Sequence, residues 1–407
     1  MSTHRVQRTD WAEEQVEKLL AGPLISEFVF RGPKYLDKTE KEVIDFLLLH
    51  KGSSILISQK TQEEPDSRDS AENQSWVEKH VVRSLKPIKG VINHPIKFEK
   101  WCIHPRLGKV DFASIPPIVH AISIVETWEQ VELSRQSIDL PVEYKGVPIS
   151  YFSIHDFCNL VLNLRTIPEL LKYLTERRSL PKKDTLTIGD EETLFRLYLL
   201  KGGTFHGCRG RADARRAIIT HWDRVEEALR RHAEYVDSSK FIEFVADFLA
   251  ERDPEYAEGL PHEALDKFDD SAHRKNYMIL QGYLTDLDLR ERAELGKAFL
   301  SLCEGTSKLP SAFVFQSFTS DKRPFVILVI SARGLDKATI YARCKELTGA
   351  ALSYFQKKQC LTIVEREGRH FDFALSVLDP VLTPEDVRAG LKYFGSLKIR
   401  LIDISRL

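Results

Sequence analysis

The chain has 407 residues, 43% of them hydrophobic and 29% charged, which is the balance of a globular protein with two or three domains. Lys and Arg number 59 against 60 Asp and Glu, and the formal net charge of -1 excludes a basic field over the whole chain, though not local basic patches. No apolar run approaches the roughly 18 residues of a membrane span, and the N-terminus lacks the apolar segment of a secretory signal. We therefore expect no membrane partner and a cytoplasmic location.

Six cysteines are scattered along the chain without a CxxC pair or a regular interval. This spacing fits neither a disulfide framework nor a zinc ribbon. It predicts reduced thiols, as in a cytoplasmic protein.

Residues 1–150 are predicted to form an α/β domain. A three-and-four residue apolar repeat predicts a helix between Val77 and Ile92, which Pro87 should end or kink. The other predicted elements are a helix at 11–20, hairpin strands at 43–49 and 54–58, a polar loop at 62–74 and a strand at 119–125.

Residues 151–305 are predicted to form a helical region. Thr166 and Glu169 have the spacing of a capping box at the start of a helix. Further helical periods run through residues 191–200, 214–232, 240–251 and 291–303.

Residues 306–407 predict a ferredoxin-like α+β domain. The expected elements are a strand at 325–330, a helix at 336–356, strands at 361–364 and 371–376, a helix after Thr383 and a strand at 397–404. This is the β-α-β-β-α-β order of the split βαβ unit. Because that fold serves many unrelated roles, it predicts little about function.

The most informative local feature is a carboxylate within an apolar run, followed by a lysine at the end of the next run. Asp45 interrupts residues 43–49, and Lys60 follows residues 54–58. Burying a carboxylate costs free energy unless it is paired or binds a metal ion. If the two runs form a hairpin, Asp45 and Lys60 come close together. An acid that holds Mg²⁺ and a lysine that orients water would suit phosphodiester hydrolysis.

Over roughly residues 10–130 this arrangement resembles the PD-(D/E)XK, or restriction-endonuclease-like, superfamily, within it the nuclease-related (NERD-like) branch. The resemblance implies a nuclease that uses Mg²⁺ or Mn²⁺, with Asp45 as the metal-binding aspartate and Lys60 as the motif lysine. Ser58 occupies the position of the expected second carboxylate, and a serine cannot replace a charged metal ligand.

Other residues near this motif are candidates to complete the site. Gln59 and Gln62 are candidate catalytic residues, although strand alternation points Gln59 to the face opposite Ser58. The candidate metal ligands besides Asp45 are Glu17 on the first helix, with Glu13 and Glu14 as neighbours, and Glu63, followed by Glu64 and Asp66.

Two interpretations of the motif stay open. Asp45 and Lys60 can be a lone, partly buried ion pair, since most such pairs carry no chemistry. The chain would then be an inactive nuclease-like scaffold that binds a protein partner through residues 306–407. Ser58 favours this alternative to a metal-dependent nuclease.

A Gly- and Arg-rich stretch is the predicted nucleic-acid contact. Its candidate phosphate-binding residues are Lys201, Arg209, Arg211, Arg215 and Arg216. Acidic residues such as Asp213 and Glu227 interleave at helical spacing, so a solvated helix face with ion pairs explains the same residues. No Gly-Lys-Ser/Thr follows the glycines, which argues against a nucleotide-binding P-loop.

Overall fold

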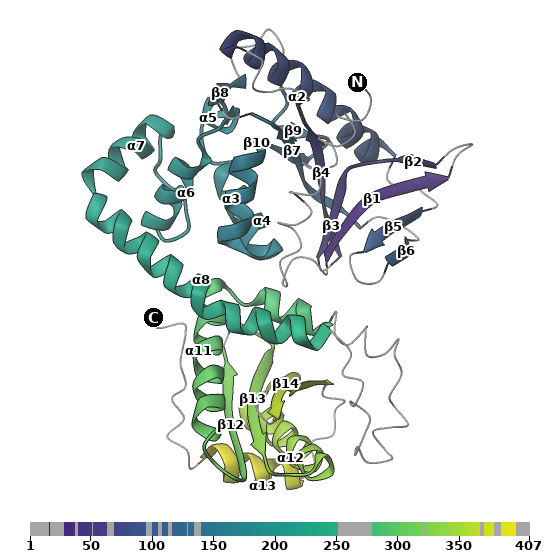
Figure 1. Ribbon diagram of the computed structural model, residues 1–407, viewed down its shortest axis with the longest axis vertical. Helices are drawn as coiled ribbons and strands as arrows, with labels where there is room; N and C mark the ends of the chain where they lie inside the picture. The colour runs from purple at the N-terminus through teal and green to yellow at the C-terminus, as the bar shows by residue number, and fades with distance from the viewer. Residues whose placement is uncertain are drawn as a thin grey trace. The chain divides into compact units, whose positions relative to one another are not determined.

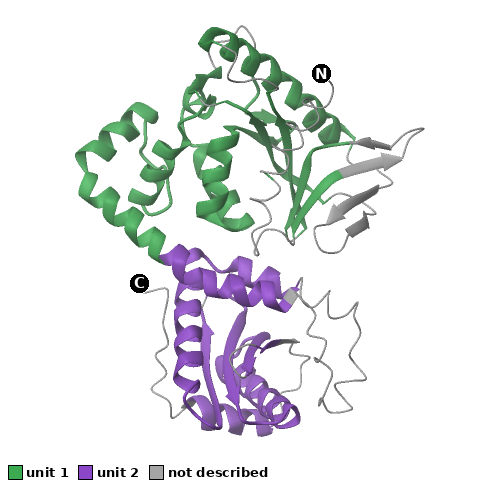
Figure 2. Cartoon of the chain, viewed as in Figure 1, with its two compact units in different colours: residues 1–234 green, residues 235–407 purple. Residues whose placement is uncertain are grey.

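The computed structural model is a mixed α/β protein whose chain divides into two compact units, residues 1–234 and 235–407 (Figures 1 and 2). The structure describes residues 16, 28–36, 40–50, 52–62, 69–94, 100–104, 108–112, 116–127, 129–133, 140–250, 279–320, 322–366, 370–377 and 384–395. The sequence predicted three domains, with boundaries after residues 150 and 305, and this division differs from the observed one.

Unit 1 is built on a mixed sheet with the strand order β6-β5-β1-β3-β4-β7-β10-β9, and β2 pairs with β1. Its strands are β1 (Val29–Leu36), β2 (Glu40–Glu42), β3 (Phe46–His50), β4 (Ser53–Lys60), β5 (Lys100–His104), β6 (Gly108–Phe112), β7 (Ile118–Val125), β9 (Glu143–Tyr144) and β10 (Val147–Ser153). A separate pair joins β8 (Val131–Glu132) to β11 (Thr187–Ile188). The sequence predicted β3, β4 and β7 but not β1 or β10.

The predicted hairpin is present, since β3 and β4 pair antiparallel with Phe46 opposite Ile57. Gly52 in the connecting turn has a φ of +72°, a conformation that favours glycine. On its other side β4 pairs in parallel with β7, with Lys60 opposite Val125. The carboxyl ends of β4 and β7 therefore lie at the same edge of the sheet.

Helix α2 (Ser70–Asn93) covers one face of this sheet. Its apolar side chains, including Val77 and Leu85, pack with Leu56 of β4 and Ala121 of β7. The expectation that Pro87 ends or kinks the helix at that point is wrong in one respect, because the helix continues to Asn93. The buried apolar side chains on both sides of Pro87 hold the last turns on the sheet.

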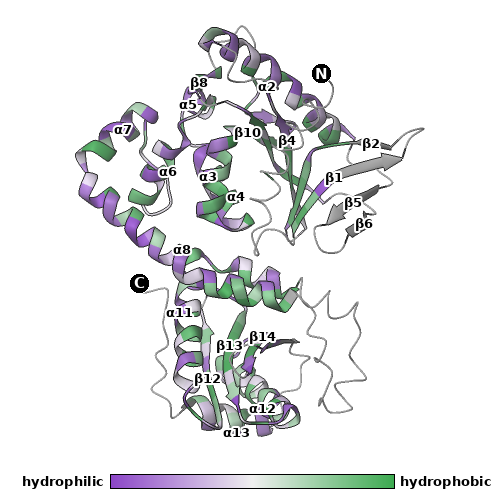
Figure 3. Ribbon diagram, in the orientation of Figure 1, coloured by the Kyte–Doolittle hydropathy of each residue, from purple (hydrophilic) through white to green (hydrophobic). Residues whose placement is uncertain are grey.

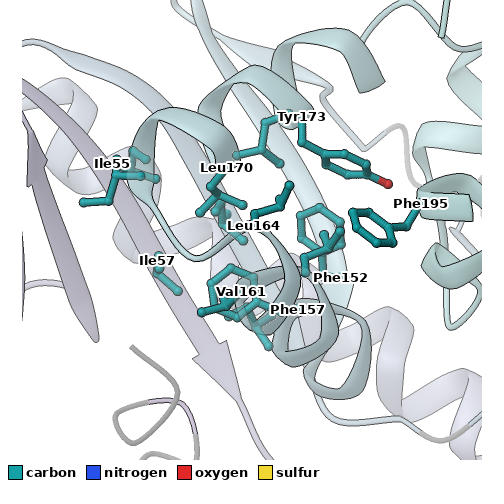
Figure 4. Packing of buried hydrophobic residues seen from close by; sticks show 14 of the residues in the cluster. Ile55, Ile57, Phe152, Phe157, Val161, Leu164, Leu170, Tyr173 and Phe195 are labelled. Atoms are coloured by element: carbon teal, nitrogen blue, oxygen red, sulfur yellow. The ribbon is translucent and has the colours of Figure 1, made fainter. Parts of the chain in front are cut away.

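The opposite face is covered by helices that follow β10, of which α3 (Ile154–Leu164) and α4 (Ile167–Arg177) share a core with the sheet. Helices α6 (Glu191–Leu200) and α7 (Arg211–Thr220) extend this core, and the short α5 (Lys182–Thr185) lies beside β11. Phe157 and Val161 of α3 and Leu170 of α4 share one core with Ile55 and Ile57 of β4 (Figure 4). This shared core explains why the predicted boundary after residue 150 is not observed: α3 and α4 need the sheet to bury their apolar sides.

Helix α8 (Trp222–Ala250) is continuous, although the sequence predicted separate helices at 214–232 and 240–251. Residues 233–239, between the two predicted helices, are also helical, and the Ser239 hydroxyl donates to the Val236 carbonyl oxygen at 2.9 Å. The boundary between the units, at residues 234 and 235, falls within this helix.

Unit 2 contains a four-stranded sheet with the order β12-β13-β14-β15. The elements are a helix at residues 279–286, α11 (Leu289–Thr306), β12 (Ala312–Thr319), β13 (Phe325–Arg333), α12 (Lys337–Phe355), β14 (Gln359–Arg366), β15 (His370–Val377), α13 (Pro384–Gly390) and a π-helical turn, η4 (Leu391–Gly395). Strands β13 and β14 pair directly and in parallel across α12.

This direct pairing differs from the predicted ferredoxin-like arrangement. In a split βαβ unit another strand lies between the two strands that the helix connects. Here β13 and β14 are both almost fully buried, and β13 is a continuous hydrophobic segment in Figure 3. Strands of this kind are typical of the centre of a sheet covered on both faces. The predicted strand at 397–404 and most of the predicted helix at 11–20 lie outside the described residues.

Candidate functional site

Asp45 and Lys60 lie next to each other across the β3–β4 hairpin. The Lys60 Nζ is 3.8 Å from the Asp45 Oδ2, and the two side chains keep 31% and 19% of their exposure. Asp45 occupies the bend directly before β3, and Lys60 is the last residue of β4. The hairpin thus brings together the two residues that the sequence singled out.

The backbone of Gln59 holds both charged groups. Its amide N–H donates to the Asp45 Oδ2 at 2.6 Å, and its carbonyl oxygen accepts from the Lys60 Nζ at 2.7 Å. The other carboxylate oxygen of Asp45 makes no hydrogen bond with the described residues. One oxygen of Asp45 therefore has a structural role, and the second can bind a ligand.

Buried polar atoms without hydrogen-bond partners gather at this end of β4. Among the described residues they include the Ser58 Oγ, both amide atoms of Gln59 and the Gln62 Oε1. Their side chains are at most 5% exposed. Since buried polar groups are nearly always hydrogen-bonded, each such atom calls for a water molecule, an ion or a ligand. Their concentration in residues 58–62 marks this edge of the sheet as a candidate site.

Gln59 and Ser58 lie on opposite faces of β4, as strand alternation predicted. Leu56 belongs to the core under α2, whereas Ile57 belongs to the core under α3 and α4. Continuing this alternation puts Ser58 and Lys60 on the α2 side and the amide of Gln59 on the α3 side. The side chain of Gln59 is thus separated from Lys60, and its backbone makes the contacts to the charged pair.

Gln62, two residues after β4, is hydrogen-bonded to Glu126 and Asn73. Its backbone N–H donates to the Glu126 Oε2 at 2.7 Å, and its Nε2 donates to the Asn73 Oδ1 at 2.7 Å and to the Glu126 carbonyl oxygen at 3.0 Å. The Glu126 N–H in turn donates to the carbonyl oxygen of Lys60 at 3.0 Å. Gln62 therefore connects the ends of β4 and β7 to the first turn of α2.

Glu126 and Asn73 are the residues of this network that sequence reasoning missed. Glu126 directly follows the apolar strand β7, just as Lys60 ends the apolar strand β4. The rule that selected Lys60, a charged residue at the end of an apolar run, would also have found Glu126. No comparable signal marks Asn73, which falls inside the predicted loop at 62–74.

The start of α2 continues the same network. Asp69 and Glu72 form a capping box, in which each side chain accepts from the backbone N–H of the other. The Ser70 hydroxyl donates to Glu129, with both carboxylate oxygens 2.8 Å away. This anchoring holds the first turn of α2 beside the candidate site.

The described residues supply one clear ligand for a divalent metal ion, the carboxylate of Asp45. No group of three or more His, Cys, Asp and Glu side chains that could hold a metal ion occurs in the described part of the chain. The amide oxygens of Gln59 and Gln62 are of the chemical type that Ca²⁺ and Mg²⁺ accept, but they are neutral. The predicted ligands Glu17 and Glu63, like Glu13, Glu14, Glu64 and Asp66, lie outside the described residues.

The predicted nucleic-acid-binding stretch consists mostly of cations that are engaged within unit 1. The contacts are Lys201 Nζ to the His206 carbonyl oxygen at 2.8 Å, Arg215 to Asp190 at 2.8 Å, and Arg216 to Asp213 at 3.7 Å. The side chain of Arg209 is exposed, and its backbone N–H donates to Asp213. These contacts agree with the alternative that the sequence left open, a helix surface with internal ion pairs.

Arg211 does not fit the role of a phosphate ligand. It is 4% exposed, and its guanidinium donates to the carbonyl oxygen of Thr187 at 2.8 Å and to the Glu191 carboxylate at 3.0 Å. A side chain with its donors occupied inside the protein cannot reach a nucleic acid. The interpretation of Arg211 as a contact residue is therefore corrected: it holds α7 against α6.

Comparison of this chain with protein-family models, with curated protein sequences and with solved structures finds no match. The relationship to the PD-(D/E)XK superfamily thus stays a prediction from the sequence. In the described part of the chain, no helix has both the length and the apolar character needed to cross a membrane.

Proposed function

We propose that unit 1 is a nuclease-related module that hydrolyses phosphodiester bonds of nucleic acids, with Asp45 and Lys60 at its centre. The observation that carries this proposal is the 3.8 Å approach of the Lys60 ammonium to the Asp45 carboxylate. The pair lies where β4 ends beside the parallel strand β7, and ligand sites in α/β sheets occur at the carboxyl ends of parallel strands.

The proposed roles of Asp45 and Lys60 in catalysis follow from the charges of their side chains. A divalent cation such as Mg²⁺ or Mn²⁺ on the oxygen of Asp45 that has no partner among the described residues would polarise the phosphodiester, and Glu17 or Glu63 is the expected second acid. Lys60 would offset the negative charge that develops on the phosphate oxygens and orient the attacking water. Gln62 would act as a positioning residue, since it fixes the chain directly after Lys60.

The second candidate function is an inactive nuclease-like scaffold that binds a protein partner through residues 306–407. Ser58 favours it, because the position of the expected second carboxylate carries a fully buried hydroxyl. The backbone of Gln59 favours it as well, because its N–H donates to Asp45 and its carbonyl oxygen accepts from Lys60, which gives both residues a purely structural use.

A cleavage assay separates the two functions. Plasmid DNA, single-stranded DNA and RNA are incubated with the full-length protein and Mg²⁺ or Mn²⁺, and the wild type is compared with Asp45→Asn and Lys60→Ala. We expect metal-dependent cleavage by the wild type and a loss of at least 100-fold in each variant, since a positioned acid or base contributes about 10²–10⁴-fold to a rate.

Arg366→Ala is the matched control, because Arg366 and Asp372 form another half-buried ion pair, at 2.5 Å, in unit 2. The Arg366→Ala variant should cleave nucleic acid at the rate of the wild type. If no substrate is cleaved with either metal, or if cleavage survives both substitutions at the site, the nuclease proposal is wrong.

A further inference from the structure

Helix α2 carries a row of cations on its exposed side. Lys79, Arg83 and Lys86 are exposed and follow each other at intervals of four and three residues, so they share one face of the helix. Lys89 stands beside this row, with its Nζ 5.3 Å from the centre of the Tyr144 ring. Residues 79–94 contain no Asp or Glu. We call Lys79, Arg83 and Lys86 the α2 cation row.

No carboxylate among the described residues lies within ion-pair distance of the α2 cation row. The contact of Arg83 is with a histidine rather than a carboxylate, since its Nη1 is 3.2 Å from the Nε2 of His80. The ring of His80 stacks on Trp76 at 3.9 Å, and its Nδ1 lies 2.8 Å from the Trp76 carbonyl oxygen. This support orients the guanidinium of Arg83 without neutralising its charge.

The basic residues of α7 and α8 provide the contrast. Arg216 pairs with Asp213 at 3.7 Å, Arg230 with Glu227 at 2.6 Å, and Arg231 with Glu227 at 3.1 Å. Their positive charge is balanced locally, whereas no carboxylate of the described residues pairs with the α2 cation row. The field that attracts a polyanion therefore comes from α2 rather than from the stretch that the sequence indicated.

From these observations we infer that the α2 cation row binds the phosphate backbone of a nucleic acid. At 1.5 Å per residue, Lys79 and Lys86 stand about 10 Å apart along the helix axis, which matches about three phosphates of one strand. Asn73, one and a half turns before Lys79, is hydrogen-bonded to Gln62 next to the candidate site. A strand held by the row would thus run towards Asp45 and Lys60, and this deepens the proposed function on which it rests.

An anionic membrane would also attract lysines and arginines, but α2 lacks the second requirement for a membrane surface. Binding to an interface needs an apolar helix face that enters the lipid. The apolar residues of α2, such as Val77 and Val81, are buried against the sheet, and Val82 is exposed by 37%. Charge without free apolar surface favours a hydrated polyanion such as nucleic acid.

The test measures binding without cleavage. Labelled 30-nucleotide DNA and RNA, single- and double-stranded, are titrated with the full-length protein in EDTA at 50, 100 and 200 mM salt, with fluorescence anisotropy as the readout. The triple variant Lys79→Gln, Arg83→Gln and Lys86→Gln should bind at least tenfold more weakly at 100 mM salt. The slope of log K against log salt should fall by about 2 to 3, roughly 0.7–0.9 per phosphate contact.

The matched control is the triple variant Arg216→Gln, Arg230→Gln and Arg231→Gln, which removes the same net charge from exposed but ion-paired positions. It should bind like the wild type. Circular dichroism and thermal unfolding show whether both triple variants are folded. Equal losses in the two triple variants, no binding by the wild type, or equal binding to polyglutamate or to phosphatidylserine vesicles would each overturn the inference.

Comparing this binding titration with the cleavage assay keeps the two proposals apart. If binding depends on the row while no substrate is cleaved under any condition, the α2 inference stands and the nuclease proposal fails. If cleavage depends on Asp45 while the triple variant of α2 binds normally, the nuclease proposal stands and the α2 inference fails.

Discussion

Arg177 and Glu191 form a buried, two-pronged ion pair between α4 and α6. The Arg177 Nε lies 2.6 Å from the Glu191 Oε1, the Nη2 lies 3.0 Å from the Oε2, and both side chains are 2% exposed. Arg211 reaches the same carboxylate at 3.0 Å, and the Tyr173 hydroxyl donates to it at 2.7 Å. Burial by itself would raise the pKa of Glu191, but the two guanidinium groups outweigh it and hold the pKa below its usual range.

This arrangement makes Glu191→Gln a strongly destabilising substitution. It removes the carboxylate that pairs with the buried Arg177 guanidinium, while Arg211 keeps only the longer contact to Asp190 at 3.6 Å. Breaking a buried pair in this way costs about 3–5 kcal/mol. Urea unfolding followed by circular dichroism should show a much lower midpoint. Glu192→Gln is the control, since Glu192 pairs with Arg196 at the surface, and we expect a change below about 1 kcal/mol. Similar midpoints for the two variants would contradict the structural role assigned to Glu191.

His120 on β7 predicts a pH dependence of stability. It is 2% exposed, its Nε2 lies 2.9 Å from the Ser150 Oγ, and burial, aided by the positive charges of Arg178 and Arg177, lowers its pKa from 6.5 to about 3. Below pH 6.5 this histidine is protonated in the unfolded chain but not in the folded protein. The free energy of unfolding therefore decreases as the pH is lowered, by up to about 1.4 kcal/mol per pH unit, until the pH reaches about 3.

His120→Gln removes this contribution. The difference in unfolding free energy between pH 7 and pH 5 should shrink by about 2 kcal/mol relative to the wild type, because one full proton is no longer taken up on unfolding across most of that interval. His155→Gln, at an exposed position, should leave the difference unchanged. An unaltered pH profile for His120→Gln would mean that folding does not lower the pKa of this histidine.

Substitutions of Asp45 distinguish its structural oxygen from its proposed catalytic one. In Asp45→Ala the backbone N–H of Gln59 loses its acceptor, and the free energy of unfolding should fall by about 1–3 kcal/mol. Asp45→Asn retains an oxygen acceptor and should cost less than about 1 kcal/mol. Both variants should lose cleavage. Asp45→Asn should lose it while keeping nearly the stability of the wild type, whereas Asp45→Ala should lose both. Full activity in a stable Asp45→Asn protein would rule out a catalytic carboxylate.

Gln62→Met tests the connection between the ends of β4 and β7. Methionine has a similar size but no amide, so the Asn73 Oδ1 and the Glu126 carbonyl oxygen lose a donor. We expect a cost of about 1–3 kcal/mol and faster hydrogen exchange at the end of β4. Gln74→Met is the control, since the Gln74 amide donates only to Glu78 within α2, and it should change stability by less than about 1 kcal/mol. Equal effects would show that Gln62 does not hold the site together.

Local features of the sequence predicted the central part of the candidate site. The runs at 43–49 and 54–58 differ from β3 and β4 by only a few residues, and the turn at Gly52 sets their register. Because a hairpin brings nearby residues together, Asp45 and Lys60 could be paired before their distance was known. The periods of α2, α4 and α6 were visible for the same reason, since each amphipathic pattern reports the side that a helix buries.

Contacts between distant parts of the chain could not be predicted from local sequence patterns. Gln62 and Glu126 are 64 residues apart, and the direct pairing of β13 with β14 replaced the predicted split arrangement. Arg211 was a candidate phosphate-binding residue because the sequence shows its charge but not the carboxylate that meets it inside the fold. Strand β12 also escaped prediction, since an edge strand is half-buried and has a weaker pattern.

The hairpin with its acid and its lysine, and the apolar sides of helices such as α2, α4 and α6, were determined by the sequence alone. Only the tertiary structure decided which positive charges are neutralised, which polar atoms are buried without partners, and which strand ends share an edge. The physical reason is range: backbone preferences and apolar periods act over a few residues, whereas electrostatic balance and hydrogen-bond satisfaction depend on neighbours that folding brings from anywhere in the chain.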